Sequence, residues 1–279
     1  KFRPAPLLVQ YVDAGWVGYH TGKDPLPDVA VTATSKSVTD FGATPDDDTD
    51  DTKAFLAAAD AVSNGVISVP AGKFILTERV YLKKSHVVLR GAGVGKTVLY
   101  MPKSLGDVYG LTFDGAGHSN WSFGGGFLTV QGSDAGKTLT TVTAKAARGA
   151  TTLTVASASG ITAGQWIRIV QTDAGGSMLK AFHEGYYPGN DGEDGGKELY
   201  HFYSPVKSVQ GNAVTLERPL PFPIDTAWSP TVKAMAPTVQ EVGIEHLTVK
   251  FAGTPYPGHF KEHGYNAIQV SGAHHAWVR

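Results

Sequence analysis

Histidine, lysine and tyrosine side chains gather near the end of this 279-residue chain, and they could move protons and bind anions. Five of the ten histidines fall within residues 246–275. Imidazole titrates near neutral pH and can serve as a general base or acid, whereas an ammonium group offers positive charge. We interpret this group as a groove for an anionic sugar polymer, with His263, Tyr265 and Lys261 as the catalytic residues.

Further side chains of the same kinds are expected to bind the polymer. The alternation of Leu247, Val249 and Phe251 predicts that His246 and Lys250 share the outward face of a strand. A Gly-rich aromatic segment near residues 180–203 predicts a second binding wall. The alternative interpretation is that these groups only fill hydrogen-bonding positions in turns, or dock a connecting loop. The expected substrate-binding residues are Lys250, His246, His259, His274, His275, His183, Tyr186 and Tyr187.

Two chemistries and one role without catalysis fit these residues. A polysaccharide lyase takes the proton beside a uronate carboxylate, so it needs a base and a cation that stabilises the developing charge. A glycoside hydrolase instead needs two carboxylates about 5–9.5 Å apart. Several acids are available, but the sequence pairs no two of them. The third alternative is a non-catalytic extracellular structural or adhesion protein. Among the three, a polysaccharide lyase is the leading hypothesis.

Two strings resemble ligand-binding motifs but are incomplete. The run Gly91-Ala-Gly-Val-Gly-Lys-Thr97 lacks the first Gly of a phosphate-binding loop, since position 90 is Arg, and no helix is expected after it. Asp46, Asp48 and Asp50 alternate like calcium ligands, but the sixth position is Asp51 and the twelfth is not Glu. We therefore expect no cofactor and no metal site. A calcium ion is left open as an alternative, but no complete motif supports it.

The elements that must position these residues begin after an acidic turn. Residues 46–52 can cap a helix, and apolar residues at helical spacing predict a short helix over about 50–62. Short β-rich runs follow, at 66–69, 74–76, 80–82, 87–89, 98–101, 110–113 and 127–130. Apolar centres at Ile67, Val88 and Leu111 recur at the interval of a solenoid repeat. We therefore predict an all-β protein of stacked coils.

The same segment resembles a known family. Asp40-Phe-Gly-Ala, Thr49-Asp-Asp-Thr, Val69-Pro-Ala-Gly and Leu89-Arg-Gly-Ala-Gly are similar to motifs in the N-terminal coils of the pectate-lyase-like superfamily. The resemblance covers about sixty residues, from Val38 to Leu99. It implies a right-handed parallel β-helix with a short N-terminal capping helix. It also implies a carbohydrate-active protein that is secreted or extracellular, with the periplasm or a cell surface as alternatives.

Changes in composition divide the chain into four parts. Residues 1–37 are expected to form an extended arm and residues 38–136 the first coils. Residues 137–236 alternate polar and apolar positions around a Gly211-Asn212 turn, which predicts an inserted antiparallel β subdomain. Residues 237–279 are expected to resume the coils and to continue beyond Arg279, or to be joined by the remainder of the chain as a separate fragment.

Composition excludes several classes of function. With a formal net charge of −1, the chain has no general attraction to nucleic acid or anionic membranes. With no cysteine, it has no disulfide and no thiolate nucleophile. No segment approaches the roughly 20 apolar residues that span a bilayer. The expected partner is thus a polysaccharide, and a larger extracellular assembly is the alternative.

Overall fold

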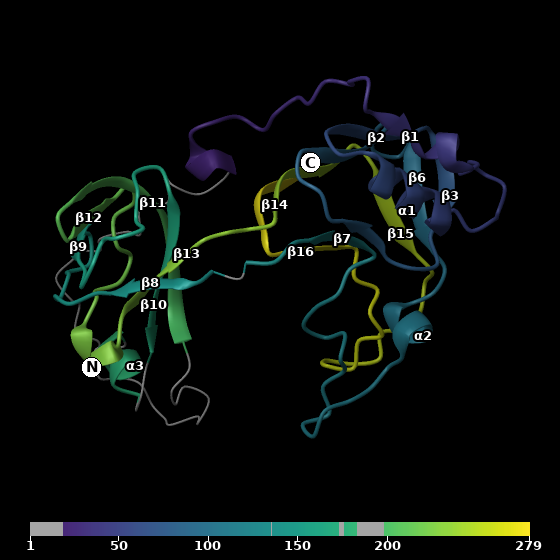
Figure 1. Cartoon of the computed structure of the whole chain (residues 1–279). Helices are drawn as coiled ribbons and strands as arrows, with labels where there is room; N and C mark the ends of the chain where they lie inside the picture. Colours follow the sequence, from purple (N-terminus) through teal and green to yellow (C-terminus); the bar gives the residue numbers. More distant parts are fainter. Residues whose placement is uncertain (1–18, 135, 173–175, 183–197) are drawn as a thin grey trace, which may run out of the picture. The chain divides into compact units, whose positions relative to one another are not determined.

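The computed structural model describes residues 19–134, 136–172, 176–182 and 198–279, and these residues form two compact units (Figure 1). One unit, here called the coil unit, comprises residues 23–134 and 237–279. The other, here called the inserted unit, comprises residues 135–236 together with 1–22, where the structure describes a 3-10 turn, η2 (Tyr19–Gly22). No helix within the described ranges is long and apolar enough to cross a membrane.

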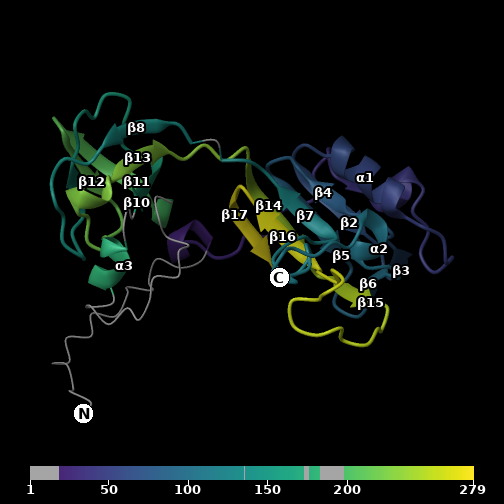
Figure 2. The same ribbon diagram turned by 90° about the horizontal axis from the view of Figure 1, so that it is seen from below.

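The coil unit contains three sheets in which neighbouring strands run parallel (Figure 2). The five-stranded sheet contains β1 (Lys36–Ser37), β2 (Gly65–Val69), β5 (Val87–Gly91), β14 (Val239–Glu245) and β17 (Ala273–Val278). A three-stranded sheet contains β3 (Gly72–Ile75), β6 (Thr97–Met101) and β15 (Thr248–Phe251). The last sheet contains β4 (Val80–Leu82), β7 (Leu128–Gln131) and β16 (Ile268–Ser271).

The chain visits these three sheets in the same order on every turn. Strands β2, β3 and β4 form one coil, β5, β6 and β7 the next, and β14, β15 and β16 the third. Ile67 pairs with Leu89, which pairs with Ile244, so the third coil stacks directly on the second although the inserted unit separates them in sequence. The predicted repeat of Ile67, Val88 and Leu111 is therefore wrong in register, because Val88 pairs with Val66 and Leu111 lies in no strand.

Inward-facing aliphatic and aromatic side chains form one continuous core in the coil unit. Phe74 on β3, Leu99 on β6 and Phe127 just before β7 are fully buried. Helix α1 (Thr52–Ala61) lies within the range expected for a capping helix. Its Phe55 and Ala58 pack against the same core, and the Phe55 and Phe74 rings meet edge to face at 5.7 Å. The helix thus covers apolar residues that would otherwise face water.

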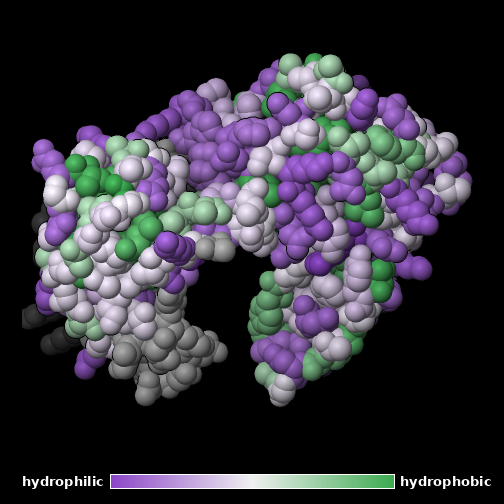
Figure 3. All heavy atoms as spheres, viewed as in Figure 1, coloured by the Kyte–Doolittle hydropathy of each residue, from purple (hydrophilic) through white to green (hydrophobic). Residues whose placement is uncertain are grey.

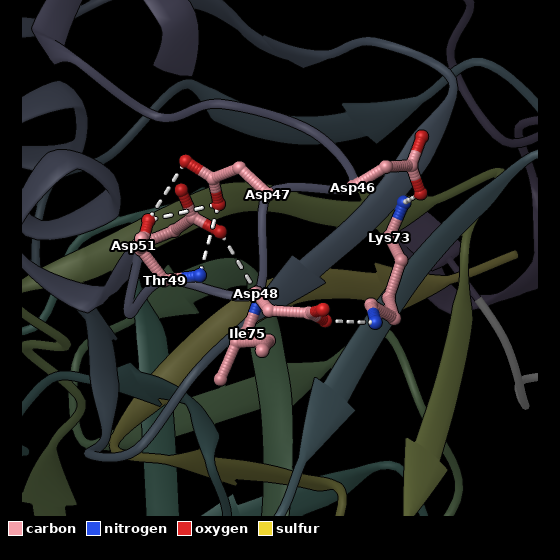
Figure 4. A network of polar contacts seen from close by, with 7 residues as sticks. All are labelled: Asp46, Asp47, Asp48, Thr49, Asp51, Lys73 and Ile75. Atoms are coloured by element: carbon pink, nitrogen blue, oxygen red, sulfur yellow. Dashed lines mark hydrogen bonds and ion pairs between the residues drawn. The ribbon is translucent and has the colours of Figure 1, made fainter.

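The acidic turn before α1 is held by backbone contacts (Figure 4). The buried Asp51 carboxylate accepts hydrogen bonds from the backbone N–H groups of Thr44 and Ile75. Asp50 accepts one from the Thr52 N–H at the start of the helix, although the N-cap residue is Asp51, whose side chain makes no capping hydrogen bond. Lys73 pairs with Asp48 at 2.5 Å. These contacts fix the loop to β3.

A buried ion-pair column runs along the five-stranded sheet. Glu245 is 1% exposed and contacts Arg90 at 2.5 Å and Arg279 at 2.9 Å. The Trp277 indole donates a further hydrogen bond to its carboxylate. Burial opposes ionisation of Glu245, but the Trp277 and Arg90 hydrogen bonds and the two arginine charges hold its pKa below the usual value. The second coil therefore contributes Arg90 and the third Glu245, while Arg279 follows β17 and Ser68 stands at this position of the first coil.

Two further expectations about the coils are wrong, and the structure adds one helix that the sequence does not predict. Residues 110–113 are a loop rather than a strand, because Asn120 binds both Thr112 and Gly110 and folds the chain back. A second helix, α2 (Leu105–Tyr109), precedes that loop although no helical pattern predicts it. Residues 242–251 are two strands, because His246 has a φ of 58° and turns the chain between β14 and β15. His246 and Lys250 therefore do not share one strand.

Residues 23–35 of the expected arm lie along the five-stranded sheet. Asp28 lies 3.5 Å from Arg90, and the Ser35 hydroxyl accepts a hydrogen bond from Val66 at the start of β2. The 3-10 turn η3 (Val38–Phe41) follows β1 and has a Ser37–Asp40 capping box. The arm before residue 19 is outside the described residues.

The inserted unit has one six-stranded sheet in which neighbours run antiparallel. Its order is β8 (Thr138–Thr141), β13 (Thr231–Ala234), β10 (Trp166–Thr172), β11 (Glu198–Gln210), β12 (Ala213–Leu216) and β9 (Thr152–Thr154). The hairpin between β11 and β12 turns at Gly211-Asn212, as the sequence indicates. Val206, Ile167 and Leu153 are fully buried in a separate core. The described part of this unit also contains two short elements, α3 (Ser177–Phe182) and η4 (Thr226–Trp228).

Candidate functional site

A hollow of the coil unit lies against the segment that joins β15 to β16. It encloses about 220 Å³, and its walls include the side chains of Glu262, His263 and Tyr265. Thr254, Pro255, Tyr256, Pro257 and Asn266 complete the lining. The segment therefore folds back on itself and brings an acid, an imidazole and two phenols around one space.

Helix α2 fixes the backbone of this segment. The N–H groups of Leu105 and Gly106, which the first helical turn leaves free, donate to the carbonyls of Gly264 and His263 at 3.1 and 2.9 Å. Gly264 has a φ of +90° and packs so closely that a Cβ would lie 2.9 Å from the Cβ of Leu105. The Ser104 hydroxyl and the Asp107 carboxylate form the capping box that starts the helix. A short helix thus sets the directions of His263 and Tyr265.

Glu262 is the most heavily bonded residue of the hollow. Its carboxylate accepts hydrogen bonds from the Ser122 hydroxyl at 2.6 Å and the Phe260 N–H at 3.2 Å, and the Tyr256 hydroxyl lies 3.4 Å away. The Ser122 contact leads the effects that lower the pKa of Glu262. Removal from water, followed by the nearby Glu262 charge, raises the pKa of Tyr256. Glu262 therefore stays ionised and Tyr256 stays protonated at neutral pH.

A cationic groove adjoins the hollow on the outer face of β15. It encloses about 560 Å³, within the roughly 300–1,000 Å³ typical of ligand sites. Its lining includes Lys250, Tyr100 and Lys73, of which Lys73 is paired with Asp48. Phe251 also lines the groove, and its ring meets the Tyr265 ring edge to face at 5.5 Å. Groove and hollow are therefore neighbours, and Lys250 supplies the groove with an ammonium group.

The structure brings together only part of the expected site. His263 and Tyr265 share the hollow, and Lys250 lies in the groove beside it. Lys261 is exposed, and its N–H donates to Gly258 in a turn that keeps it out of the lining. His259 is also exposed, and its ring packs on Phe260 at 3.7 Å. These residues belong to the loop between β15 and β16, rather than to a following coil.

Three other expected residues lie elsewhere on the coil unit. His246 lies in the turn before β15, where its N–H donates to the Arg279 carbonyl. His274 and His275 lie on β17 of the five-stranded sheet. His183, Tyr186 and Tyr187 lie outside the described residues.

Sequence reasoning missed three contributors to the hollow. Glu262 stands among many acids and Tyr256 in a Pro-rich loop, so neither has a distinctive local pattern. Ser122 is far from both in sequence. The one signal that could have located the support is Ser104-Leu-Gly-Asp107, a capping box at the start of α2.

The sequence profile of a family described as "Rhamnogalacturonase A/epimerase, pectate lyase-like" matches residues 35–163. Together with the three parallel sheets, this match agrees with the resemblance read from the sequence. Residues 35–163 are similar to the pectate-lyase-like superfamily. The match covers the strands of the first two coils and extends into the inserted unit.

The chain is similar to curated proteins over a small part of their length. Mannuronan C5-epimerases AlgE5 and AlgE3 of Azotobacter vinelandii are each 34% identical over 107 residues, which is 35% of this chain and 11% and 6% of theirs. Among solved structures, the tailspike gp61 of Pseudomonas phage phi297 matches 88% of this chain with a TM-score of 0.53 and 15% identity. The chain spans 37% of that tailspike, so the likeness is one of fold.

Proposed function

We propose that the protein binds a polysaccharide containing uronic acid on its coil unit and cleaves it by β-elimination. The observation that carries this proposal is the shared hollow of His263 and Tyr265 beside the Lys250 groove. The printed names of the epimerase relatives support the substrate class, because mannuronan is a polymer of a uronic acid.

The site residues fit the steps of an elimination. Lys250 would bind the uronate carboxylate and stabilise the charge that develops when the adjacent C5–H bond breaks. His263 would accept that proton, the electron pair would form the C4–C5 double bond, and the C4–O bond would break. Tyr265 would donate a proton to the departing oxygen. Glu262, held by Ser122, would hydrogen-bond sugar hydroxyls.

The hollow is less suited to hydrolysis by two carboxylates. Among its described lining residues, Glu262 is the single carboxylate, whereas either stereochemical outcome of hydrolysis needs a pair. C5 epimerisation is the second candidate, because the relatives carry that name and the reaction begins with the same proton abstraction. It differs in returning a proton to C5 rather than breaking the C4–O bond.

We further infer that the three parallel sheets form a right-handed parallel β-helix and that the protein works outside the cytoplasm, where such polymers occur. The likeness to a tailspike supports this reading of the fold. That the protein is part of a larger extracellular assembly is likewise a proposal.

The two chemistries are separated by their products. The protein is incubated with pectate, alginate or a glycosaminoglycan, and absorbance near 235 nm is followed, since elimination creates an unsaturated uronate. Deuterium incorporation from heavy water at C5 without that absorbance would indicate epimerisation. New reducing ends without it would indicate hydrolysis, and no change in any assay would indicate a binding protein that lacks catalysis.

A further inference from the structure

A cluster of aromatic rings lies next to the hollow on the coil unit. The rings of Phe123 and Phe260 are 5.3 Å apart, and His118 packs edge to face against both, at 5.5 and 4.5 Å. Phe123 is 71% exposed, although a large apolar side chain normally loses water on folding. We call Phe123, Phe260 and His118 the aromatic platform.

The platform is held in place by a hydrogen-bonded hairpin rather than by a loose loop. Asp114 accepts bonds from the N–H groups of Ala116 and His118, and its carboxylate lies 3.0 Å from the His118 ring nitrogen Nδ1. The Ser119 N–H donates to the Phe260 carbonyl, which joins the hairpin to the loop between β15 and β16. A ligand would therefore meet rings already in position, which lowers the entropy lost on binding.

The platform is continuous with the hollow through Glu262. Ser122, the residue before Phe123, donates to the Glu262 carboxylate at 2.6 Å, and Phe260 donates its N–H to the same carboxylate. The Ser119 hydroxyl donates to the Glu262 carbonyl at 2.5 Å. Figure 3 shows hydrophobic and hydrophilic atoms side by side on the lobe that these loops form. A polymer in the hollow would pass from charged contacts directly to exposed rings.

We propose that the platform binds the apolar C–H face of a pyranose ring in the same uronate polymer, at a unit next to those in the hollow. A flat ring with one apolar face suits Phe123, which offers its π surface and no charge. The proposal rests on the proposed function for the class of substrate. It adds a second point of attachment, so it predicts a dependence on chain length that the hollow alone would not give.

The test compares Phe123→Ala, Phe123→Leu and the unchanged protein by electrophoresis in native gels that contain alginate, pectate or hyaluronan. An aromatic contact of about 0.5–1.5 kcal/mol corresponds to roughly 2- to 13-fold in affinity. We expect F123A to weaken retardation by about that factor for a retarding polymer. We expect F123L to weaken it also, because Leu keeps apolar bulk but loses the flat face. Val94→Ala is the control, since Val94 is 77% exposed on the turn between β5 and β6.

Each outcome bears on the platform separately from catalysis. Equal retardation of F123A and the unchanged protein would overturn the proposed binding role of the platform. Full affinity in F123L would overturn it too, as would the finding that no polymer retards the unchanged protein. Weaker retardation of F123A without any absorbance near 235 nm would support the platform and refute β-elimination. Equal thermal midpoints of the variants show that binding, rather than folding, has changed.

Discussion

Substitution of Gly264 gives the sharpest test of how helix α2 holds the hollow. A side chain at this position would add both backbone strain and a steric clash. An Ala there would adopt a φ of +90°, which costs about 1–2 kcal/mol for an L-residue. Its Cβ would also lie 2.9 Å from Leu105 Cβ and from the Trp121 ring, and such overpacking costs about 1–3 kcal/mol. We therefore expect G264A to lower the free energy of unfolding by about 2–5 kcal/mol.

Gly42 supplies the matched control. Its φ of +95° is nearly the same, but no atom lies within 4 Å of where a Cβ would be placed. G42A should therefore cost only the backbone part, about 1–2 kcal/mol. With a slope of roughly 2 kcal/mol per M of urea, the unfolding midpoint of G264A should lie about 1 M below that of G42A.

Turnover provides a second measurement on the same pair. A shift of the His263 and Gly264 carbonyls away from α2 would displace the site by about 1 Å, which can reduce turnover about 100-fold. Gly42 follows η3 and does not line the hollow, so G42A should keep full turnover. Equal urea midpoints for the two variants would refute the packing argument. A destabilised G264A with normal turnover would show that α2 does not position the site.

Three more predictions concern single residues. Replacing His263 with Ala or Tyr265 with Phe should reduce turnover by about 10² or more with little change in KM, and unchanged initial rates at 235 nm would discard their assignment. K250M should raise KM and weaken its dependence on salt, whereas K96M, on an exposed turn, should not; equal KM values for the two would remove Lys250 from binding. Because the folded pKa of Glu245 is lowered, its stabilising effect should be present above its unfolded pKa and be lost as the pH falls through the folded value. In E245Q the two arginines lose their buried charged partner, which should lower the free energy of unfolding by about 3–5 kcal/mol. Urea midpoints measured at decreasing pH should therefore depend less on pH in E245Q than in the unchanged protein. Midpoints that fall in parallel for the two proteins would contradict this assignment.

The sequence indicates the coils well because their core depends on short apolar runs. Apart from Ser68, residues 66–69 and 87–89 are β-branched or aliphatic, and they are strands in the structure. The run at 110–113 has a similar composition but is a loop, because its hydrogen bonds go to Asn120 rather than to a neighbouring strand. A strand needs a partner, and a local sequence does not reveal whether one is present.

The site is less predictable because its geometry depends on breaks in regular alternation. Lys261, His263 and Tyr265 would share one side of an extended segment. A turn at Gly258 and the positive φ of Gly264 instead place Glu262 in the lining and leave Lys261 outside. Helix α2 is five residues long, too short for periodicity to show, so the support of His263 is also hidden from pattern reasoning.

The position of the inserted unit has a consequence for the order of folding. The coils are interrupted after Ser133, and the chain returns at Thr238, where the two residues exchange hydrogen bonds. Val87 must nevertheless pair with Val242, 155 residues later, so this contact waits until the whole inserted unit has been synthesised. An inserted unit that folds first would bring 133 and 238 together and remove most of the entropy cost of that closure. Its own stability would then set how quickly the third coil docks on the second.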